Sequence, residues 1–148
     1  MNLQIRTFSE SDRAAVVALW HACGLVHPQN DPDRDIDRKL ADRVDFFIVA
    51  ESDGTIVGSA MGGYEGHRGW VNYVAVDPAH RRHGIGRRMM EELERRLAAV
   101  GCPKINLQIR ASNVAVAEFY RSIGFAQDDV ICMGRRLIDD SVAAQHPR

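Results

Sequence analysis

The sequence predicts an α/β protein in which helices cover both faces of a mixed β-sheet. In the first half, strand-like runs at 45–52, 56–64 and 70–76 are separated only by turn residues, as in antiparallel hairpins. In the second half, strand-like and helix-like segments alternate, which favours parallel pairing through a crossover helix. The 148 residues, 45% of them hydrophobic, suit a single domain. We expect that domain at 1–138, with a loose tail at 139–148.

The first half begins with a short alternating strand at 3–8. Ser9 or Ser11 then caps a helix that ends at Gly24, and a loop at 27–35 leads to a short charged helix. The hairpin strands follow, with turns at 52–55 and 65–69. Asp77-Pro78 ends the last of them, because proline cannot continue a hydrogen-bonded ladder.

The second half contains the longest predicted helix, from about Gly84 to Ala99, with its apolar residues on one face. A strand at 104–109, a capped helix at 112–124 and a last strand at 130–137 complete the order β-α-α-β-β-β-α-β-α-β.

Composition excludes several classes of protein. The net charge of −1 provides no overall field for nucleic acid or an anionic membrane, and no apolar run approaches the ~20 residues of a membrane helix. Three widely spaced cysteines predict neither a disulfide framework nor a metal site, and free thiols suit the reducing cytoplasm. The first residues lack the basic and apolar regions of a signal peptide.

The stretch Arg-Arg-His-Gly-Ile-Gly at 81–86 joins a predicted strand to the long helix. Free N–H groups at a helix start, two glycines and local positive charge favour a phosphate site. A Rossmann fingerprint would need a third glycine where Met89 stands, and the Walker lysine is absent. From these six residues alone, a glycine-rich helix start beside solvated arginines is an equal alternative.

Two longer segments carry a family resemblance. Residues 74–94 match a signature Arg/Gln-x-x-Gly-x-Gly/Ala through Arg81, Gly84 and Gly86. Residues 107–125 match a second signature through Asn113 and Tyr120, followed by Gly-Phe. Both resemble the GNAT superfamily of acyl-CoA-dependent N-acyltransferases, and the second is also similar to ribosomal-protein N-terminal acetyltransferases. The resemblance implies a mostly antiparallel sheet whose central strands splay apart beyond Val74.

The resemblance also implies acetyl-CoA as cosubstrate and no metal. The turn would hold the pyrophosphate, the strand would bind the pantetheine arm, and the second signature would contact that arm. The implied cofactor-binding residues are Val74, Ala75, Val76, Arg81, Arg82, His83, Gly84, Ile85, Gly86, Arg87 and Asn113. Asn113 is also a plain helix N-cap, and the two roles are compatible.

For catalysis, the resemblance places a general acid at Tyr120, although helical spacing alone would make it a core residue. Many members carry a carboxylate where this chain has Asn72, which cannot act as a base. Glu65 and His67 are the nearest replacements, or they belong to an exposed hairpin turn.

We therefore expect transfer of an acetyl group from acetyl-CoA to a primary amine, by direct attack in a ternary complex. The acceptor is a small molecule or a peptide N-terminus, bound by the first helices and the 27–35 loop. A non-catalytic acyl-CoA-binding regulatory module is the alternative. A helix-in-groove DNA binder is disfavoured, because glutamates alternate with the arginines of the long helix. We expect no nucleic-acid or membrane partner, and a homodimer stays open.

Overall fold

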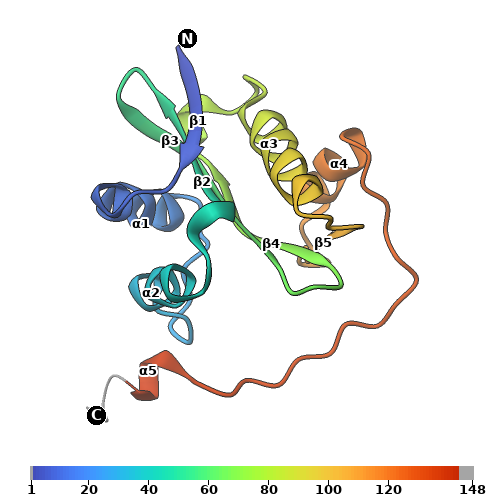
Figure 1. Ribbon diagram of the computed structural model, residues 1–148. Coiled ribbons are helices and arrows are strands. Elements are labelled where there is room, and N and C mark those ends of the chain that lie inside the picture. Colours follow the sequence, from blue (N-terminus) through green and yellow to red (C-terminus); the bar gives the residue numbers. More distant parts are fainter. Residues whose placement is uncertain (1, 144–148) are drawn as a thin grey trace.

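A five-stranded mixed sheet forms the centre of the computed structural model, which describes residues 2–143 (Figure 1). The strand order is β1-β2-β3-β4-β5, antiparallel from β1 to β4 and parallel between β4 and β5. The strands span Leu3–Thr7, Phe47–Ser52, Thr55–Tyr64, Gly69–Val76 and Ile105–Leu107. The predicted fold class, a mostly antiparallel sheet with hairpins followed by a parallel crossover, is confirmed.

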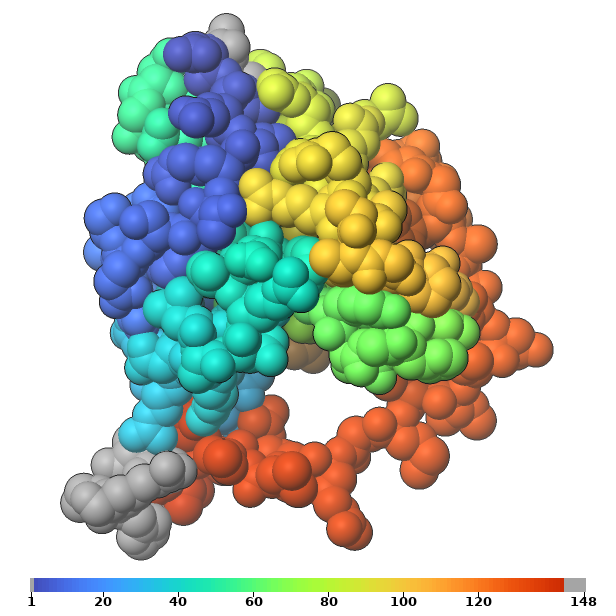
Figure 2. Space-filling view, viewed as in Figure 1, coloured from blue at the N-terminus to red at the C-terminus, as the bar shows by residue number. Residues whose placement is uncertain are grey.

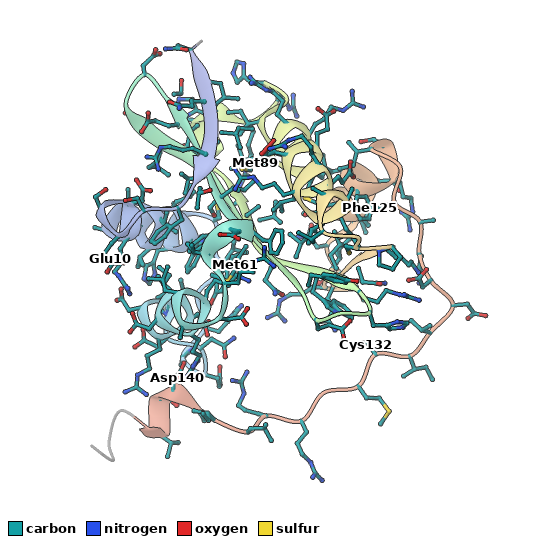
Figure 3. All side chains as sticks on the ribbon, viewed as in Figure 1. Glu10, Met61, Met89, Phe125, Cys132 and Asp140 are labelled. Atoms are coloured by element: carbon teal, nitrogen blue, oxygen red, sulfur yellow. The ribbon has the colours of Figure 1, made fainter. Side chains whose placement is uncertain are left out.

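Helices cover both faces of the sheet and create two apolar cores. Helices α1 (Arg13–Ala22) and α2 (Pro32–Asp42) pack on one face, and α3 (Ile85–Ala99) and α4 (Val114–Ser122) on the other. Short 3₁₀ turns occupy Glu10–Asp12, Val44–Phe46 and Pro78–His80. Figure 3 shows Met61 on the α1–α2 side and Met89 on the α3 side. The sheet is therefore buried on both faces, which explains why β2 and β3 are apolar almost throughout.

Strands β4 and β5 pair over only three positions. Gly69, Trp70 and Val71 face Ile105, Asn106 and Leu107, and there the pairing stops. Strand β4 continues to Val76 against β3 alone. The two strands therefore separate just after Val71, earlier than the predicted point beyond Val74, and one edge of β4 lies open.

A β-bulge interrupts the β3–β4 ladder at the same place. Ser59 faces Ala75 and Met61 faces Asn72, so one residue of β3 lies opposite two residues of β4. The two are Tyr73 and Val74, and Tyr73 has a φ of +51°. A tyrosine in this left-handed region is rare, and the bulge leaves one backbone position outside the ladder.

Side chains hold the bulged backbone in place. The ring of Tyr73 stacks on Trp20 with 3.8 Å between centroids, and its hydroxyl donates to Asp35 at 2.6 Å. The fully buried Ser59 hydroxyl accepts from Trp20 Nε1 at 2.8 Å and donates to the Tyr73 carbonyl at 3.1 Å. Three elements distant in sequence thus fix one strained residue, as expected of backbone strain that persists in a fold.

The predicted last strand at 130–137 is wrong. Residues 126–139, which we call the C-terminal arm, leave α4 and run around the molecule without strand pairing (Figure 1). Figure 2 shows an open gap between the arm and the body. Among the described residues the backbone of 126–138 forms no hydrogen bond with other backbone groups, so the segment is not a strand of the sheet. Beyond the arm, Asp140–Ala143 forms helix α5 beside α2, and 144–148 of the predicted tail lie outside the described residues.

Replacing Ser59 with alanine should destabilise the protein. The change removes a partner from Trp20 Nε1 and from the Tyr73 carbonyl inside the core, where a lost partner costs about 1–3 kcal/mol. Urea unfolding should show that loss, whereas Ser122→Ala, at an exposed helix end, should unfold like the unaltered protein. Equal stability of both variants would mean that Ser59 does not hold the bulge.

Candidate active site

The turn from Arg81 to Gly84 precedes α3, and the first N–H groups of that helix are exposed. Arg82 and Gly84 have φ values of +68° and +74°, and no side chain caps the helix. The Arg88 N–H donates to the Gly84 carbonyl at 3.1 Å, so the preceding N–H groups at 85–87 have no intrahelical acceptor. Such a turn forms a concave array of donors at the positive end of the helix dipole.

The open edge of β4 leads directly to this turn. Val74 and Val76 pack into the α3-side core, whereas Ala75 packs on the α1 side. The Val76 carbonyl accepts weak hydrogen bonds from Cys23 Sγ and Arg81 Nε, both at 3.4 Å. The predicted cofactor residues of β4 and of the turn therefore lie along one continuous seam where β4 and β5 have separated.

Helix α4 packs beneath the same seam. A Cβ at Gly86 would lie 3.0 Å from Phe119 Cζ, so the glycine allows α3 and α4 to approach closely. Tyr120, only 6% exposed, packs edge-on against Phe119 and Phe125 and shares the core that contains Val74. Tyr120 thus lies on the α3 side of the sheet, the side on which Val74 and Val76 also pack, and its contact with a cofactor stays a prediction.

The Tyr120 hydroxyl keeps its proton over a wide pH range. Burial raises the pKa of Tyr120 to about 12, because the phenolate would lose solvation inside the core. Among residues 2–143, its hydroxyl has no hydrogen-bond partner. A protonated hydroxyl without a partner is what a general acid requires, although the same ring is clearly a packing residue.

Asn113 has its predicted capping role. Its side-chain oxygen accepts from the Val116 N–H at 3.3 Å and begins α4. The capping role is confirmed, and contact with a pantetheine arm stays a prediction.

Glu65 and His67 lie elsewhere, in the β3–β4 turn. The Glu65 carboxylate accepts from the backbone N–H groups of Arg68 and His67, and these bonds lower its pKa. Five residues of extended strand, about 16 Å, separate Gly69 at the end of this turn from Val74. Over that distance a proton from a reactant beside Val74 would need intervening water, and a catalytic role of Glu65 or His67 stays a prediction.

A depression of about 560 Å³ opens on the α1–α2 side of the molecule. It lies where the sequence predicts the acceptor site. Its lining residues are Val17, His21, Val26, His27, Pro28, Asn30, Asp31, Pro32, Asp33, Asp140 and Ser141. Near this depression Arg110 donates to His27 at 3.0 Å, which brings the region after β5 to the same loop.

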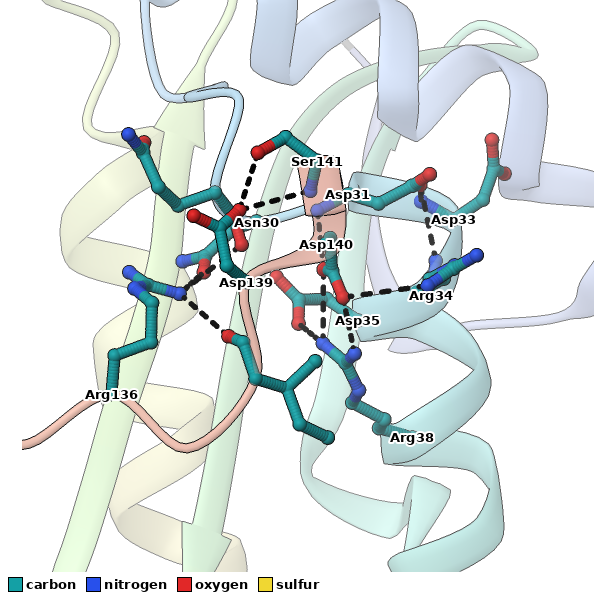
Figure 4. A network of polar contacts seen from close by, with 12 residues as sticks. Asn30, Asp31, Asp33, Arg34, Asp35, Arg38, Arg136, Asp139, Asp140 and Ser141 are labelled. Atoms are coloured by element: carbon teal, nitrogen blue, oxygen red, sulfur yellow. Dashed lines mark hydrogen bonds and ion pairs between the residues drawn. The ribbon is translucent and has the colours of Figure 1, made fainter. Parts of the chain in front are cut away.

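A polar network closes the depression from the C-terminal side (Figure 4). Asp140 is only 3% exposed. Its carboxylate accepts hydrogen bonds from the two Nη atoms of Arg38 at 2.6 and 3.2 Å and from the Asp31 N–H at 2.6 Å. The Arg38 guanidinium keeps the pKa of Asp140 below its usual value. Arg38 also bonds Asp35, the acceptor of the Tyr73 hydroxyl, so the network reaches the bulge.

Sequence patterns miss these positioning residues. Trp20, Ser59 and Tyr73 look like ordinary core or strand residues, and only the positive φ of Tyr73 reveals their joint role. In the described part of the chain, no group of three His, Cys, Asp or Glu side chains converges on a metal-sized site. None of the helices described is both long and apolar enough to cross a membrane.

Known proteins resemble this chain in sequence and in fold. The acetyltransferase (GNAT) family matches residues 13–125. An acetyltransferase of Pectobacterium atrosepticum is 47% identical over 138 residues, covering 93% of this chain and 98% of its own.

Two solved structures share the fold at low sequence identity. Ard1 of Thermoplasma volcanium superposes with a TM-score of 0.78 at 22% identity, covering 85% of this chain and 84% of its own. AAC(6')-Iy in complex with a CoA-containing bisubstrate analogue has a TM-score of 0.76 at 17% identity, covering 92% and 99%. The family match and the 47% identical relative show that the chain belongs to the acetyltransferase (GNAT) family and is an acyltransferase, and the splayed sheet and the exposed start of α3 agree with this.

Proposed function

We propose that the protein transfers the acetyl group of acetyl-CoA to a primary amine by direct attack in a ternary complex. The observation that carries this proposal is the open edge of β4 after Val71, which is followed, after the short 3₁₀ turn Pro78–His80, by the uncapped start of α3. The CoA-containing analogue in the complex of AAC(6')-Iy supports the choice of cosubstrate.

The residues of the seam fit acetyl-CoA. The N–H groups of Ile85, Gly86 and Arg87 would bind the pyrophosphate, and no side chain occupies them. The exposed side chains of Arg81, Arg82 and His83 surround the same turn and add positive charge. Along β4, the edge from Val74 to Val76 would hydrogen-bond the pantetheine arm as an added strand.

The bulge supports a catalytic role for one backbone N–H. Acetyl-CoA carries its acetyl group as a thioester, and the CoA thiolate is a fair leaving group. The N–H near Val74, released from the ladder, would donate to the thioester oxygen, and an aimed donor of this kind contributes about 3–4 kcal/mol. Tyr120 would give its proton to the departing thiolate, which its high pKa permits at neutral pH.

The acceptor amine would approach from the α1–α2 side, where the 560 Å³ depression lies. An amine with a pKa of about 10.4 is mostly charged at neutral pH and must lose a proton first. Asn72 cannot take it, and Glu65 and His67 could receive it only through a chain of water molecules. Of the two, Glu65 is the poorer acceptor, because its carboxylate already binds two backbone N–H groups.

A carboxylate beside the α3 turn should weaken acetyl-CoA binding by repelling the pyrophosphate. Gly84 has open space around it, and Asp and Asn are the side chains that best tolerate its positive φ. Gly84→Asp should therefore raise the Kd for acetyl-CoA roughly tenfold more than Gly84→Asn, which has the same shape without the charge. Calorimetry measures the Kd for acetyl-CoA of both variants. Equal constants for the two variants would exclude a pyrophosphate at this turn.

Removing only the hydroxyl of Tyr120 separates its two roles. Tyr120→Phe keeps the ring between Phe119 and Phe125, so melting temperature and acetyl-CoA affinity should change little. Loss of a positioned acid should lower kcat about 100-fold, at the lower end of the usual range because a thiolate leaves readily. With a pKa of about 12 the phenol stays protonated, so the defect should be constant between pH 7 and 9. A kcat within threefold of the unaltered enzyme, with chemistry limiting turnover, would make Tyr120 a packing residue alone.

A further inference from the structure

Trp70 is a large aromatic side chain that the fold leaves uncovered. It is 40% exposed, although its neighbours Gly69 and Val71 are buried. It belongs to neither apolar core, and among the described residues no other ring stacks on it. Trp20 donates its Nε1 hydrogen to Ser59, whereas Trp70 Nε1 has no partner in the part of the chain that the structure describes. Trp70 therefore presents a free ring face and a free donor, a combination common at binding surfaces.

Trp70 lies on the side of the sheet that carries α1 and α2. Its partner across the β3–β4 ladder is Gly63, and a Cβ on that glycine would lie 3.1 Å from Lys39 Nζ on α2. Val71, the next residue of β4, packs on the α3 side, as strand alternation requires. The core beneath α1 and α2 includes no residue of 62–72, so this end of the sheet face is open.

The open face continues along β4 to the bulge. Asn72 is the next residue on the same side as Trp70, and its exposed amide has no hydrogen-bond partner among the described residues. The bulge follows at Tyr73 and Val74, where we propose that the thioester oxygen binds. Trp70 lies four residues before Val74, about 13 Å along an extended strand. One elongated acceptor would therefore reach both places.

Two cations near Trp70 indicate the charge of such an acceptor. Lys39 Nζ lies over Gly63, opposite Trp70, and its ion pair is with the exposed Asp42 at 3.6 Å. Arg68, two residues before Trp70, donates to the neighbouring main chain and forms no ion pair among the described residues. Because like charges repel, these two side chains disfavour an acceptor whose far end is a second ammonium group. An aromatic ring without positive charge fits this surface.

We propose that Trp70 is a specificity residue, which stacks on an aromatic ring that the acceptor carries about 13 Å from the amine to be acetylated. This inference rests on the proposed acetyl transfer and narrows its substrate class to elongated primary amines with such a ring. Trp70 Nε1 and the Asn72 amide would hydrogen-bond polar groups between the ring and the amine. No residue lining the 560 Å³ depression belongs to β4, so the ring would lie on the β4 face and not in that depression.

Two isomeric peptides test the distance between ring and amine. Gly-Phe-Gly-Gly-amide and Gly-Gly-Gly-Phe-amide have the same composition and the same reacting amine. Only the second carries its ring far enough to reach Trp70, because an extended chain spans about 3.3 Å per residue. Release of the CoA thiol from acetyl-CoA should show a kcat/KM roughly tenfold higher for the second peptide.

Replacing Trp70 tests the residue itself. Trp70→Ala should abolish the preference between the two peptides, whereas Trp70→Phe, which keeps a ring, should retain most of it. As a control, Val100→Ala shortens an equally exposed side chain at the end of α3 and should keep the full preference. Calorimetry should give the same Kd for acetyl-CoA in all four proteins, because Trp70 lies outside the proposed cosubstrate edge.

Fluorescence reports on ring binding without turnover. The protein has two tryptophans, and Trp20 is fully buried. Adding Gly-Gly-Gly-Phe-amide in the presence of CoA should therefore change the emission of Trp70. The same addition should leave the emission of the Trp70→Phe protein unchanged.

The outcomes separate this inference from the proposed function. Equal kcat/KM for the two peptides, or a preference that survives Trp70→Ala, would overturn the role of Trp70 and leave acetyl transfer intact. Acetylation of other primary amines but neither binding nor turnover of Gly-Gly-Gly-Phe-amide would overturn it too. A Trp70-dependent fluorescence change without release of the CoA thiol from acetyl-CoA by any amine would instead refute the proposed function.

Discussion

The bulge at Tyr73 and Val74 is the constraint on which the candidate site depends. Tyr73 has a backbone conformation that a tyrosine rarely adopts, and its stacking on Trp20 and the Ser59 hydrogen bond keep it there. The extra residue shifts the side-chain alternation of β4, so that Val71 and Val74 both pack on the α3 side. It also removes one backbone position from the β3–β4 ladder, close to the point after Val71 where pairing with β5 stops and the other edge of β4 becomes free.

Much of the site consists of backbone, and this explains how the chain can depart from its family at individual side chains. The N–H groups at 85–87 have no intrahelical acceptor because they begin an uncapped helix, and the proposed donor near Val74 lies in a bulge; neither depends on a residue type. Asn72 in place of a carboxylate leaves that backbone unchanged. The side chains that matter most hold it: Ser59 and Trp20 from within the core, and Asp35 from α2, which Arg38 connects to Asp140 near the C-terminus.

Sequence patterns predict the elements that bury one continuous face. Helix α3 follows from the spacing of Ile85, Met89 and Leu93, and the hairpins follow from runs bounded by turn residues. The two signatures are short and local, so they single out the turn before α3 and Tyr120 from the sequence alone, and the roles of these residues stay predictions. The bulge has no local signature, since Val-Asn-Tyr-Val suits a regular strand equally well. The arm has the alternation of a strand, yet among the described residues its backbone forms no ladder hydrogen bond, and alternation alone does not reveal that.

Hydrogen exchange at single backbone amides, measured with and without acetyl-CoA, tests the account most directly. If the open edge of β4 and the start of α3 bind the cosubstrate, the amides at 74–76 and 85–87 should exchange more slowly in the complex, because each gains an acceptor. Amides of α2, on the opposite face, should change much less. Acetyl-CoA bound by calorimetry with unchanged exchange at 74–76 would contradict the central claim that the bulge and the splay create the binding edge.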